Sequence, residues 1–221
     1  MPEEPFHTYR PAEGHGLPHD PFYAIVGPRP IGWISTTGAD GVDNLAPYSF
    51  FNAFSQKPPI IGFSSSGWKD TVRNIQETGA FVWNLVTRPL AERMNLSAAT
   101  FAPGTDEFAA ARLAKLPSLA VRPPRVAASP VQFECRLTQI VRLKNASGAE
   151  VESWLTLGEV VVVHIRRDLL AGGIYDMAAA HPVLRAGGRQ WYTEITQESL
   201  FALERPASPE AALAAAERLD F

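Results

Sequence analysis

The sequence predicts a mainly β domain with intervening helices (α+β), arranged as an antiparallel barrel or sandwich. Six or seven short runs are rich in β-branched and aromatic residues, and turn signals separate them. The 19 prolines and 16 glycines among 221 residues favour many short elements over a long helical bundle. No strand–GxGxxG–helix unit occurs, so we do not expect a doubly wound parallel sheet with the usual dinucleotide fingerprint.

Residues 30–37 predict the first strand, because β-branched and aromatic residues fill this run. The turn residues at 38–41 then predict a hairpin that leads to a second strand over 44–54. Pro47 cannot donate to a strand ladder, so it predicts an edge, a bulge or a bend there. Residues 60–64 predict a short buried strand that runs into a serine-rich turn.

A helix is expected next, over residues 70–77. Asp70 is a favourable N-cap residue, and Gly79 stands where a left-handed residue commonly ends a helix. Residues 80–87 return to the composition of a strand.

The second half of the chain continues the mixture of helices and strands. Polar and apolar residues alternate from Val131 to Thr138, which is typical of a sheet with one solvated face. The predicted elements are helices over 89–99 and 105–116, a proline-rich connector over 117–130, long strands over 131–144 and 154–166 joined by a turn at 145–148, a strand over 190–195, and a helix over 207–219.

Composition narrows the class of protein. The 20 basic and 23 acidic residues give a net charge of −3, which argues against a broad nucleic-acid-binding surface. Cys135 is the single cysteine, so no intrachain disulfide forms, and we expect a reducing, cytoplasmic location. The polar, acidic N-terminus and the absence of a long apolar run predict neither a signal peptide nor a membrane span.

Three parts are expected along the chain. Residues 1–20 show no periodicity and form an N-terminal arm, residues 21–206 form the domain, and residues 207–221 form a C-terminal helical tail. The histidines of the arm have no spacing that would make them converge, so we expect no metal site.

The serine-rich turn before residue 70 suggests a phosphate site. Ser64 and Ser65 end a strand, Lys69 supplies a cation, and Thr71 supplies another hydroxyl group. The free N–H groups and the positive dipole end of the following helix face the same space. The alternative is that this stretch is only a turn whose helix is capped by Asp70.

Two neighbouring stretches, residues 29–36 and 44–52, could form a flat slot for a planar heterocycle. They combine aromatic and hydroxyl side chains with a backbone that proline interrupts. Aromatic residues at strand spacing are more often core, and that alternative applies to Phe50, Phe51 and Phe54. A phosphate end beside a planar slot describes a mononucleotide such as a flavin.

The sequence gives little support to other kinds of catalytic site. No Ser, His and acid set stands in a nucleophile-elbow context, and no HExxH motif occurs. Cys135 lies in an alternating strand, where a buried, inert thiol is expected. Trp68 and His181 could line a substrate entrance, although surface packing explains both.

The order and spacing of these residues resemble the flavin reductase-like FMN-binding split-barrel family, roughly over residues 21–196. The resemblance implies a six-stranded antiparallel split barrel, usually a homodimer, that binds FMN noncovalently near the subunit interface. It is carried by Arg29-Pro30-Ile31 with Trp33 and Ser35-Thr36, by the run from Asn44 to Asn52, and by Lys69-Asp70-Thr71 with Asn74 and Thr78-Gly79.

The same resemblance implies the cofactor-binding residues. No catalytic side chain is expected, because the redox chemistry belongs to the flavin. The phosphate side would be Ser64, Ser65, Lys69, Asp70 and Thr71, and the ribityl and ring side would be Trp33, Ser35, Ala46, Pro47, Ser49 and Phe50.

Two functions follow from the resemblance. The first is a flavin reductase that takes hydride from NAD(P)H as co-substrate, including the reductase component of a two-component monooxygenase. The alternative is an FMN-holding electron-transfer protein, similar to flavoredoxin, with little NAD(P)H turnover. A related oxidase of the pyridoxamine phosphate type is disfavoured, because the match runs to the motifs of the other group. Expected partners are a second copy of the chain and an electron acceptor, and neither nucleic acid nor a membrane.

Overall fold

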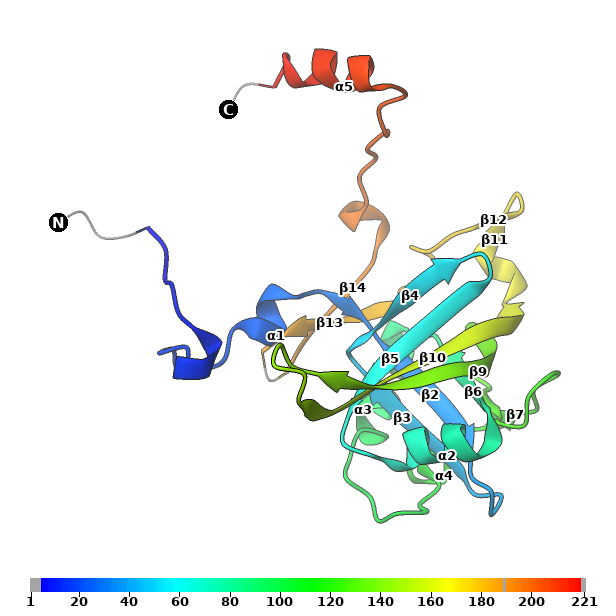
Figure 1. Cartoon of the computed structure of the whole chain (residues 1–221). Helices are drawn as coiled ribbons and strands as arrows, with labels where there is room; N and C mark the ends of the chain where they lie inside the picture. Colours follow the sequence, from blue (N-terminus) through cyan, green and yellow to red (C-terminus); the bar gives the residue numbers. More distant parts are fainter. Residues whose placement is uncertain (1–4, 189, 220–221) are drawn as a thin grey trace.

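The computed structural model describes residues 5–188 and 190–219, and its centre is one antiparallel sheet of seven strands. Figure 1 shows this sheet curving through the middle of the molecule. In spatial order its strands are β3 (Asp43–Tyr48), β2 (Gly32–Thr37), β6 (Ala80–Asn84), β9 (Val131–Lys144), β10 (Glu150–Ile165), β5 (Pro59–Ser66) and β4 (Phe51–Gln56). The mainly β fold with helices is confirmed, whereas the expected count of six strands is not.

The single strand expected over 44–54 is in fact two strands, β3 and β4, which lie at opposite ends of the sheet order. The chain leaves the first ladder after Tyr48. The Ser64 N–H then donates to the Phe50 carbonyl at 2.8 Å, and the rings of Tyr48 and Phe63 lie 4.4 Å apart. The bond continues the β4–β5 ladder, and the ring contact joins β3 to β5 near the other end of the sheet order, so the sheet closes on itself as a barrel.

Pro47 is tolerated because β3 is a terminal strand of the sheet order. An edge is one of the settings that this proline predicts. Two residues earlier, the Leu45 N–H points away from β2 and donates to Glu107 Oε2 at 2.9 Å. Backbone groups repeat their direction every second residue, so the missing N–H of Pro47 removes no bond to β2.

Two hydrophobic cores flank β2, and all six of its residues are buried. Alternate side chains of a strand point to opposite faces, so Trp33 and Ile34 belong to different cores. The core inside the curved sheet contains Ile34, Tyr48, Phe63, Val72, Ile75 and Phe81. The core on the other face contains Trp33, Leu45, Val86, Met94, Phe108 and Val126.

Helix α2 (Asp70–Thr78) follows β5 and covers the inner core. It ends as predicted, because Gly79 takes the left-handed conformation (φ +74°) and its N–H donates to the Ile75 carbonyl at 2.8 Å. Its start differs from the prediction. The N-cap residue is Lys69, whose side chain makes no capping bond, so the assignment of Asp70 as the N-cap is wrong.

Two predicted helices are much shorter than expected. In place of the helix expected over 89–99 there are a 3₁₀ turn (Arg88–Leu90) and α3 (Ala91–Leu96), and residues 105–116 hold only α4 (Glu107–Ala110) and β7 (Lys115–Leu116). Phe108 is buried in the second core, and Arg112 takes a positive φ of 52°, which turns the chain back. The returning chain pairs β7 with β8 (Arg125–Val126) inside the predicted connector, so tertiary pairing overrides the helical pattern.

The later strands agree more closely with the sequence. Strand β9 has the predicted bounds, whereas β10 begins at Glu150 rather than at residue 154. The predicted last strand is β14 (Trp191–Glu194), which pairs with β13 (Val183–Gly187), and β13 also pairs with β1 (Arg29–Pro30). A 3₁₀ turn (Arg167–Leu169) precedes the small hairpin of β11 (Leu170–Ala171) and β12 (Ile174–Tyr175).

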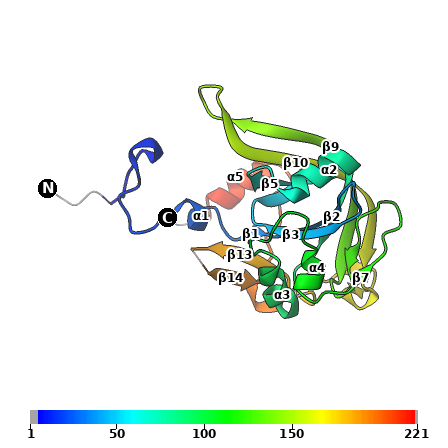
Figure 2. The ribbon, with the colours of Figure 1, turned by 90° about the horizontal axis from the view of Figure 1, so that it is seen from below.

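Both ends of the chain extend away from the barrel in Figure 1, and Figure 2 shows the N-terminal segment on one side of it. The elements at the two ends are a 3₁₀ turn (Pro11–Glu13), α1 (Phe22–Ile25), a 3₁₀ turn (Gln197–Ser199) and α5 (Pro209–Ala216). Among the described residues, every helix is too short or too polar to cross a lipid bilayer.

Candidate functional site

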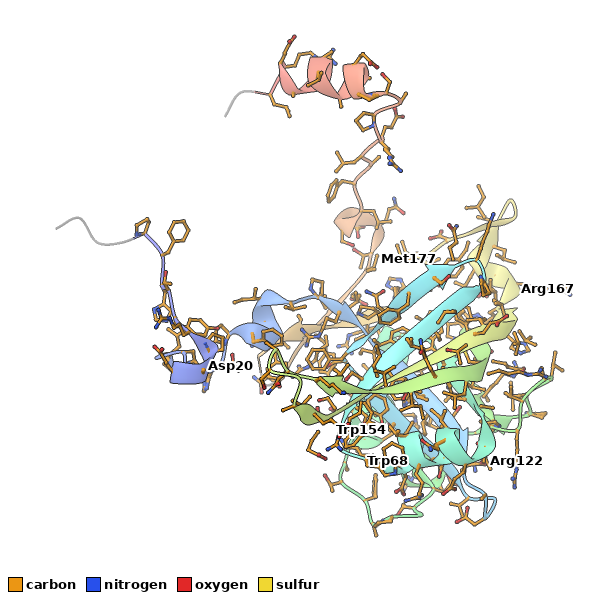
Figure 3. All side chains as sticks on the ribbon, viewed as in Figure 1. Asp20, Trp68, Arg122, Trp154, Arg167 and Met177 are labelled. Atoms are coloured by element: carbon orange, nitrogen blue, oxygen red, sulfur yellow. The ribbon has the colours of Figure 1, made fainter. Side chains whose placement is uncertain are left out.

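A cavity of about 540 Å³ lies where β3, the end of β5 and the start of α2 meet the segment 97–103. Figure 3 shows Trp68, which lines this cavity, close to Trp154, and the ring centroids of the two are 5.5 Å apart. A volume of this size suits a small-molecule ligand. Eight of the predicted residues line it, namely Ala46, Pro47, Ser49, Phe50, Ser64, Lys69, Asp70 and Thr71.

Hydroxyl groups surround the start of α2 at one end of the cavity, which we call the phosphate end. Ser64, Ser66, Lys69 and Thr71 line it. No side chain caps α2, so its first N–H groups are available. Asn44 Nδ2 donates to Thr71 Oγ1 at 2.9 Å, which fixes Thr71 and leaves its hydroxyl able to donate. Such a set of donors suits an anion of the phosphate type.

Asp70 holds the wall of the cavity together instead of capping the helix. Its Oδ1 forms an ion pair with Arg73 at 2.9 Å, and its Oδ2 accepts a hydrogen bond from the Gly104 N–H at 2.9 Å. These bonds tie the end of the segment 97–104 to α2. The ion pair also offsets the negative charge of Asp70 beside Lys69.

The link between β3 and β4 forms the opposite end of the cavity, which we call the ring end. The Ser49 carbonyl accepts from Arg29 Nε at 3.0 Å, and the Phe50 carbonyl accepts from the Ser64 N–H at 2.8 Å. Within the part of the chain that the structure describes, no hydrogen bond uses the N–H of Ser49 or Phe50. Because both residues line the cavity, these donors can serve oxygen or nitrogen acceptors of a planar heterocycle.

The Tyr48 hydroxyl is buried in the cavity wall without a hydrogen bond. Burial raises the pKa of Tyr48 to about 12, although Thr71 and Ser65 lie close enough to offset part of that effect. Neither neighbour meets hydrogen-bond geometry with it. A buried polar group left unpaired costs free energy, so a ligand that reached this hydroxyl would gain from bonding to it.

Glu107 places a carboxyl group in the same wall. Burial raises its pKa, and the nearby charges of Asp70 and Asp106 raise it further, against the hydrogen bond from the Leu45 N–H. The ionised form of Glu107 is therefore less favoured than that of an ordinary glutamate in water.

Three predicted residues do not line the cavity, because their side chains are bonded inside the protein. Trp33 is fully buried, and its Nε1 donates to Ser97 Oγ at 3.0 Å. Ser35 Oγ donates to the Pro124 carbonyl at 2.6 Å, and Ser65 Oγ donates to the Gly67 carbonyl at 2.9 Å. A role for these three residues in cofactor binding stays a prediction.

The three phenylalanines for which a core role was the alternative have different surroundings. Phe50 lines the cavity. Phe51 packs against the inner core and stacks on Trp83, with ring centroids 5.5 Å apart. Phe54 is 54% exposed, so a core role is wrong for it.

Sequence reasoning missed one whole wall of the cavity. The segment 97–103, Glu107 and Tyr23 line it, and none of these was singled out. The segment consists mostly of small residues that form no motif, and Tyr23 precedes the strands by several residues. Only contacts distant in sequence bring them to the site.

Cys135 lies in β9 and is fully buried, as expected for an inert thiol. Burial raises the pKa of the thiol, and the charge of Glu134 raises it further, so the reactive thiolate is disfavoured.

A family model and a protein of another organism both match most of this chain. The family model of the flavin reductase like domain matches residues 27–183. An uncharacterized protein of Deinococcus radiodurans is 37% identical over 182 residues, which cover 77% of this chain and 77% of that protein.

The fold is similar to three solved structures. Nitrilotriacetate monooxygenase component B from Bacillus cereus matches with a TM-score of 0.80 and 27% identity, over 90% of this chain and 100% of that chain. A protein from Shewanella frigidimarina, assigned as a flavin reductase with a split barrel domain, matches with a TM-score of 0.74 and 22% identity, over 83% and 89% of the two chains. Flavoredoxin of Desulfovibrio vulgaris matches with a TM-score of 0.69 and 22% identity, over 83% and 93%.

Proposed function

The chain belongs to the flavin reductase-like domain family, and from this premise we propose that it binds FMN in the cavity described above and transfers hydride from NAD(P)H to that flavin. The observation that carries the proposal is the cavity itself, which has a set of anion donors at one end and unused backbone donors at the other. Membership of the family makes an oxidoreductase that uses a flavin the natural assignment. The likeness to component B of a monooxygenase supports a role beside a partner protein.

The residues present fit an FMN molecule. Ser64, Ser66, Lys69 and Thr71 would hold the phosphate at the start of α2. The N–H groups of the ring end would meet the heteroatoms of the flavin ring. The Tyr48 hydroxyl, which is buried without a partner beside Thr71, offers one more group for a polar ligand to satisfy.

The bound flavin would supply the redox chemistry. The protein's own task is then to bind, orient and protect. Lys69 and the hydroxyl groups would anchor the phosphate, and the N–H groups of Ser49 and Phe50 would donate to the ring, where such donors favour added negative charge. Trp68 and the segment 97–103 stand in the cavity wall, where they would contact the bound ligand.

Lys69→Ala should weaken the binding of FMN by about 1 to 3 kcal/mol, towards the lower end because Lys69 is exposed. Riboflavin lacks the phosphate, so it should bind the variant and the wild type alike. Fluorescence titration measures both affinities, and Lys57→Ala, on the exposed turn between β4 and β5, is the matched control. Equal FMN affinity for the Lys69 variant and the wild type would contradict the phosphate assignment.

Reduction by nicotinamide nucleotides separates the two candidate functions. We expect NADH or NADPH to bleach the visible absorbance of the FMN-loaded protein rapidly in a stopped-flow experiment. The fold of flavoredoxin keeps the electron-carrier alternative open. Bleaching by dithionite or a partner protein, with none by either nucleotide, would replace the reductase by the carrier.

We also propose that the chain forms a homodimer. Phe54 on β4, with Val161 and Val163 on β10, presents exposed apolar side chains around one surface groove, and such patches commonly mark subunit contacts. Light scattering should therefore give about twice the chain mass of 24.1 kDa. A mass near that of one chain, with FMN bound, would rule out the dimer.

A further inference from the structure

We infer that Arg29 is a positioning residue for the ring end of the cavity, where it orients the Ser49–Phe50 peptide so that the Phe50 N–H faces the ligand. The inference rests on the proposed function, because it assigns this N–H to a flavin ring. In the sequence, Arg29 belongs to the stretch 29–36 of the expected slot and to the family pattern, and neither assigns a role to its side chain.

Arg29 holds two separate segments by their backbone carbonyls. Its side chain is almost fully buried, with the residue 8% exposed. Nε donates to the Ser49 carbonyl at 3.0 Å, and Nη1 donates to the carbonyls of Tyr23, at 2.6 Å, and of Val26. The guanidinium also lies over the Phe50 ring, 5.4 Å from its centroid. Arg29 therefore fixes the link between β3 and β4 against the segment that contains α1.

Because the peptide bond is planar, the hydrogen bond from Arg29 also fixes the direction of the Phe50 N–H. The Ser49–Phe50 peptide is trans, so the Ser49 carbonyl and the Phe50 N–H point in opposite directions within one plane. Because Arg29 Nε binds the carbonyl, the N–H must point away from Arg29. Ser49 and Phe50 line the cavity and Arg29 does not, so Arg29 stands behind the wall.

The next peptide is fixed independently, because the Phe50 carbonyl accepts the Ser64 N–H at 2.8 Å. Both carbonyls of the link are thus bonded within the protein, and the Phe50 N–H is left for a ligand. A donor held in this way binds without having to reorient, which favours strong interaction with a ring that gains negative charge.

An arginine suits this position better than a lysine. Its planar fork donates to two segments at once, whereas an ammonium group is a single point of charge. Among the ion pairs of residues 5–188 and 190–219, none uses Arg29, so its bonds go to carbonyl groups. Burial and the nearby charge of Arg185 lower the pKa of Arg29. The three carbonyl groups that accept hydrogen bonds from its fork compensate for the burial of the cation.

The test compares FMN with riboflavin in equilibrium titrations of the wild type, Arg29→Met and Arg29→Lys. We expect Arg29→Met to weaken both flavins by the same factor, roughly tenfold, because the lost interaction is with the ring. Arg29→Lys keeps the charge but loses the fork, so it should also weaken both flavins equally. The near-ultraviolet absorption band of the bound flavin, which responds to hydrogen bonds on the ring, should shift in both variants. Arg185→Met removes a neighbouring arginine that bonds within the β13–β14 hairpin, and it should bind both flavins as the wild type does.

Each other outcome overturns the inference. Weaker binding of FMN alone would mean that Arg29 acts on the phosphate through its charge. Wild-type affinity and an unshifted band in Arg29→Lys would show that the fork is not required, and this variant decides the question if Arg29→Met does not fold. An equal effect of Arg185→Met would indicate general charge. A wild-type chain that binds neither flavin defeats the proposed function as well, whereas normal binding by the wild type and both Arg29 variants defeats only the role of Arg29.

Discussion

Glu134→Ala should lower the free energy of unfolding by about 3 to 5 kcal/mol, because it removes a buried anion from three donors. The Glu134 carboxylate is fully buried in β9. Its oxygens accept hydrogen bonds from the Leu119 N–H at 2.8 Å and the Ala120 N–H at 2.6 Å, and His164 Nε2 lies 2.7 Å from Oε1. The carboxylate therefore anchors the connector between β7 and β8, and its loss leaves the two backbone donors and His164 without their acceptor.

Chemical unfolding without FMN measures this loss free of any contribution from ligand binding. Glu152→Ala is the matched control, since Glu152 lies on β10 with a side chain 74% exposed and pairs with Arg142 at the surface. Surface pairs contribute about 0 to 1 kcal/mol, so the control should change little. Similar losses in both variants would show that the buried contacts of Glu134 contribute nothing special.

The same carboxylate makes stability depend on pH. Burial opposes its charged form, but the two backbone donors and His164 together outweigh burial, so the pKa of Glu134 lies below its ordinary value. A lowered carboxyl pKa contributes stability above the unfolded value, and that contribution disappears as the pH falls through the folded value. The stability difference between wild type and Glu134→Gln should therefore shrink below about pH 4.5. A difference that stayed constant down to pH 3 would contradict the assignment.

The sequence correctly predicts those elements that depend on residues close together in the chain. The left-handed Gly79 and the alternation that begins at Val131 each depend on a few neighbouring residues, and the structure confirms the helix end and the bounds of β9. The break between β3 and β4 could not be predicted in this way. It depends on the bond from Ser64 to Phe50 and on the contact of Tyr48 with Phe63, which join residues more than ten positions apart.

The candidate site likewise combines residues that a pattern along the strand predicts with residues that only tertiary packing brings in. The resemblance selected consecutive residues, but neighbours on a strand point to opposite faces. Ser64 and Ser66 of β5 therefore line the cavity, whereas Ser65 between them bonds to the Gly67 carbonyl. Strict alternation along the strand predicts Ser66, and not Ser65, among the residues that line the cavity. No comparable rule could have found the segment 97–103, because its small residues reach the cavity only through tertiary packing.

Trp33→Ala should destabilise the protein by about 3 to 5 kcal/mol, because removing a large buried side chain leaves a cavity. Trp33 is fully buried in the second core, and its Nε1 donates to Ser97 Oγ at 3.0 Å. Trp191→Ala is the control, since Trp191 is 66% exposed and its loss should cost less than about 1 kcal/mol. Urea unfolding of the two variants without FMN measures the difference, and equal losses would contradict a core role.

The milder Trp33→Phe separates the core role from the predicted cofactor role. It keeps an aromatic ring but loses the bond to Ser97, whose hydroxyl also donates to the Met94 carbonyl at 2.7 Å and so stays in place beside the cavity. We therefore expect a loss of about 1 to 2 kcal/mol in stability and FMN affinity within about twofold of the wild type. If the Trp33→Phe chain folded but bound FMN tenfold more weakly, unfolding could not explain the lost affinity. Trp33 would then contribute to FMN binding.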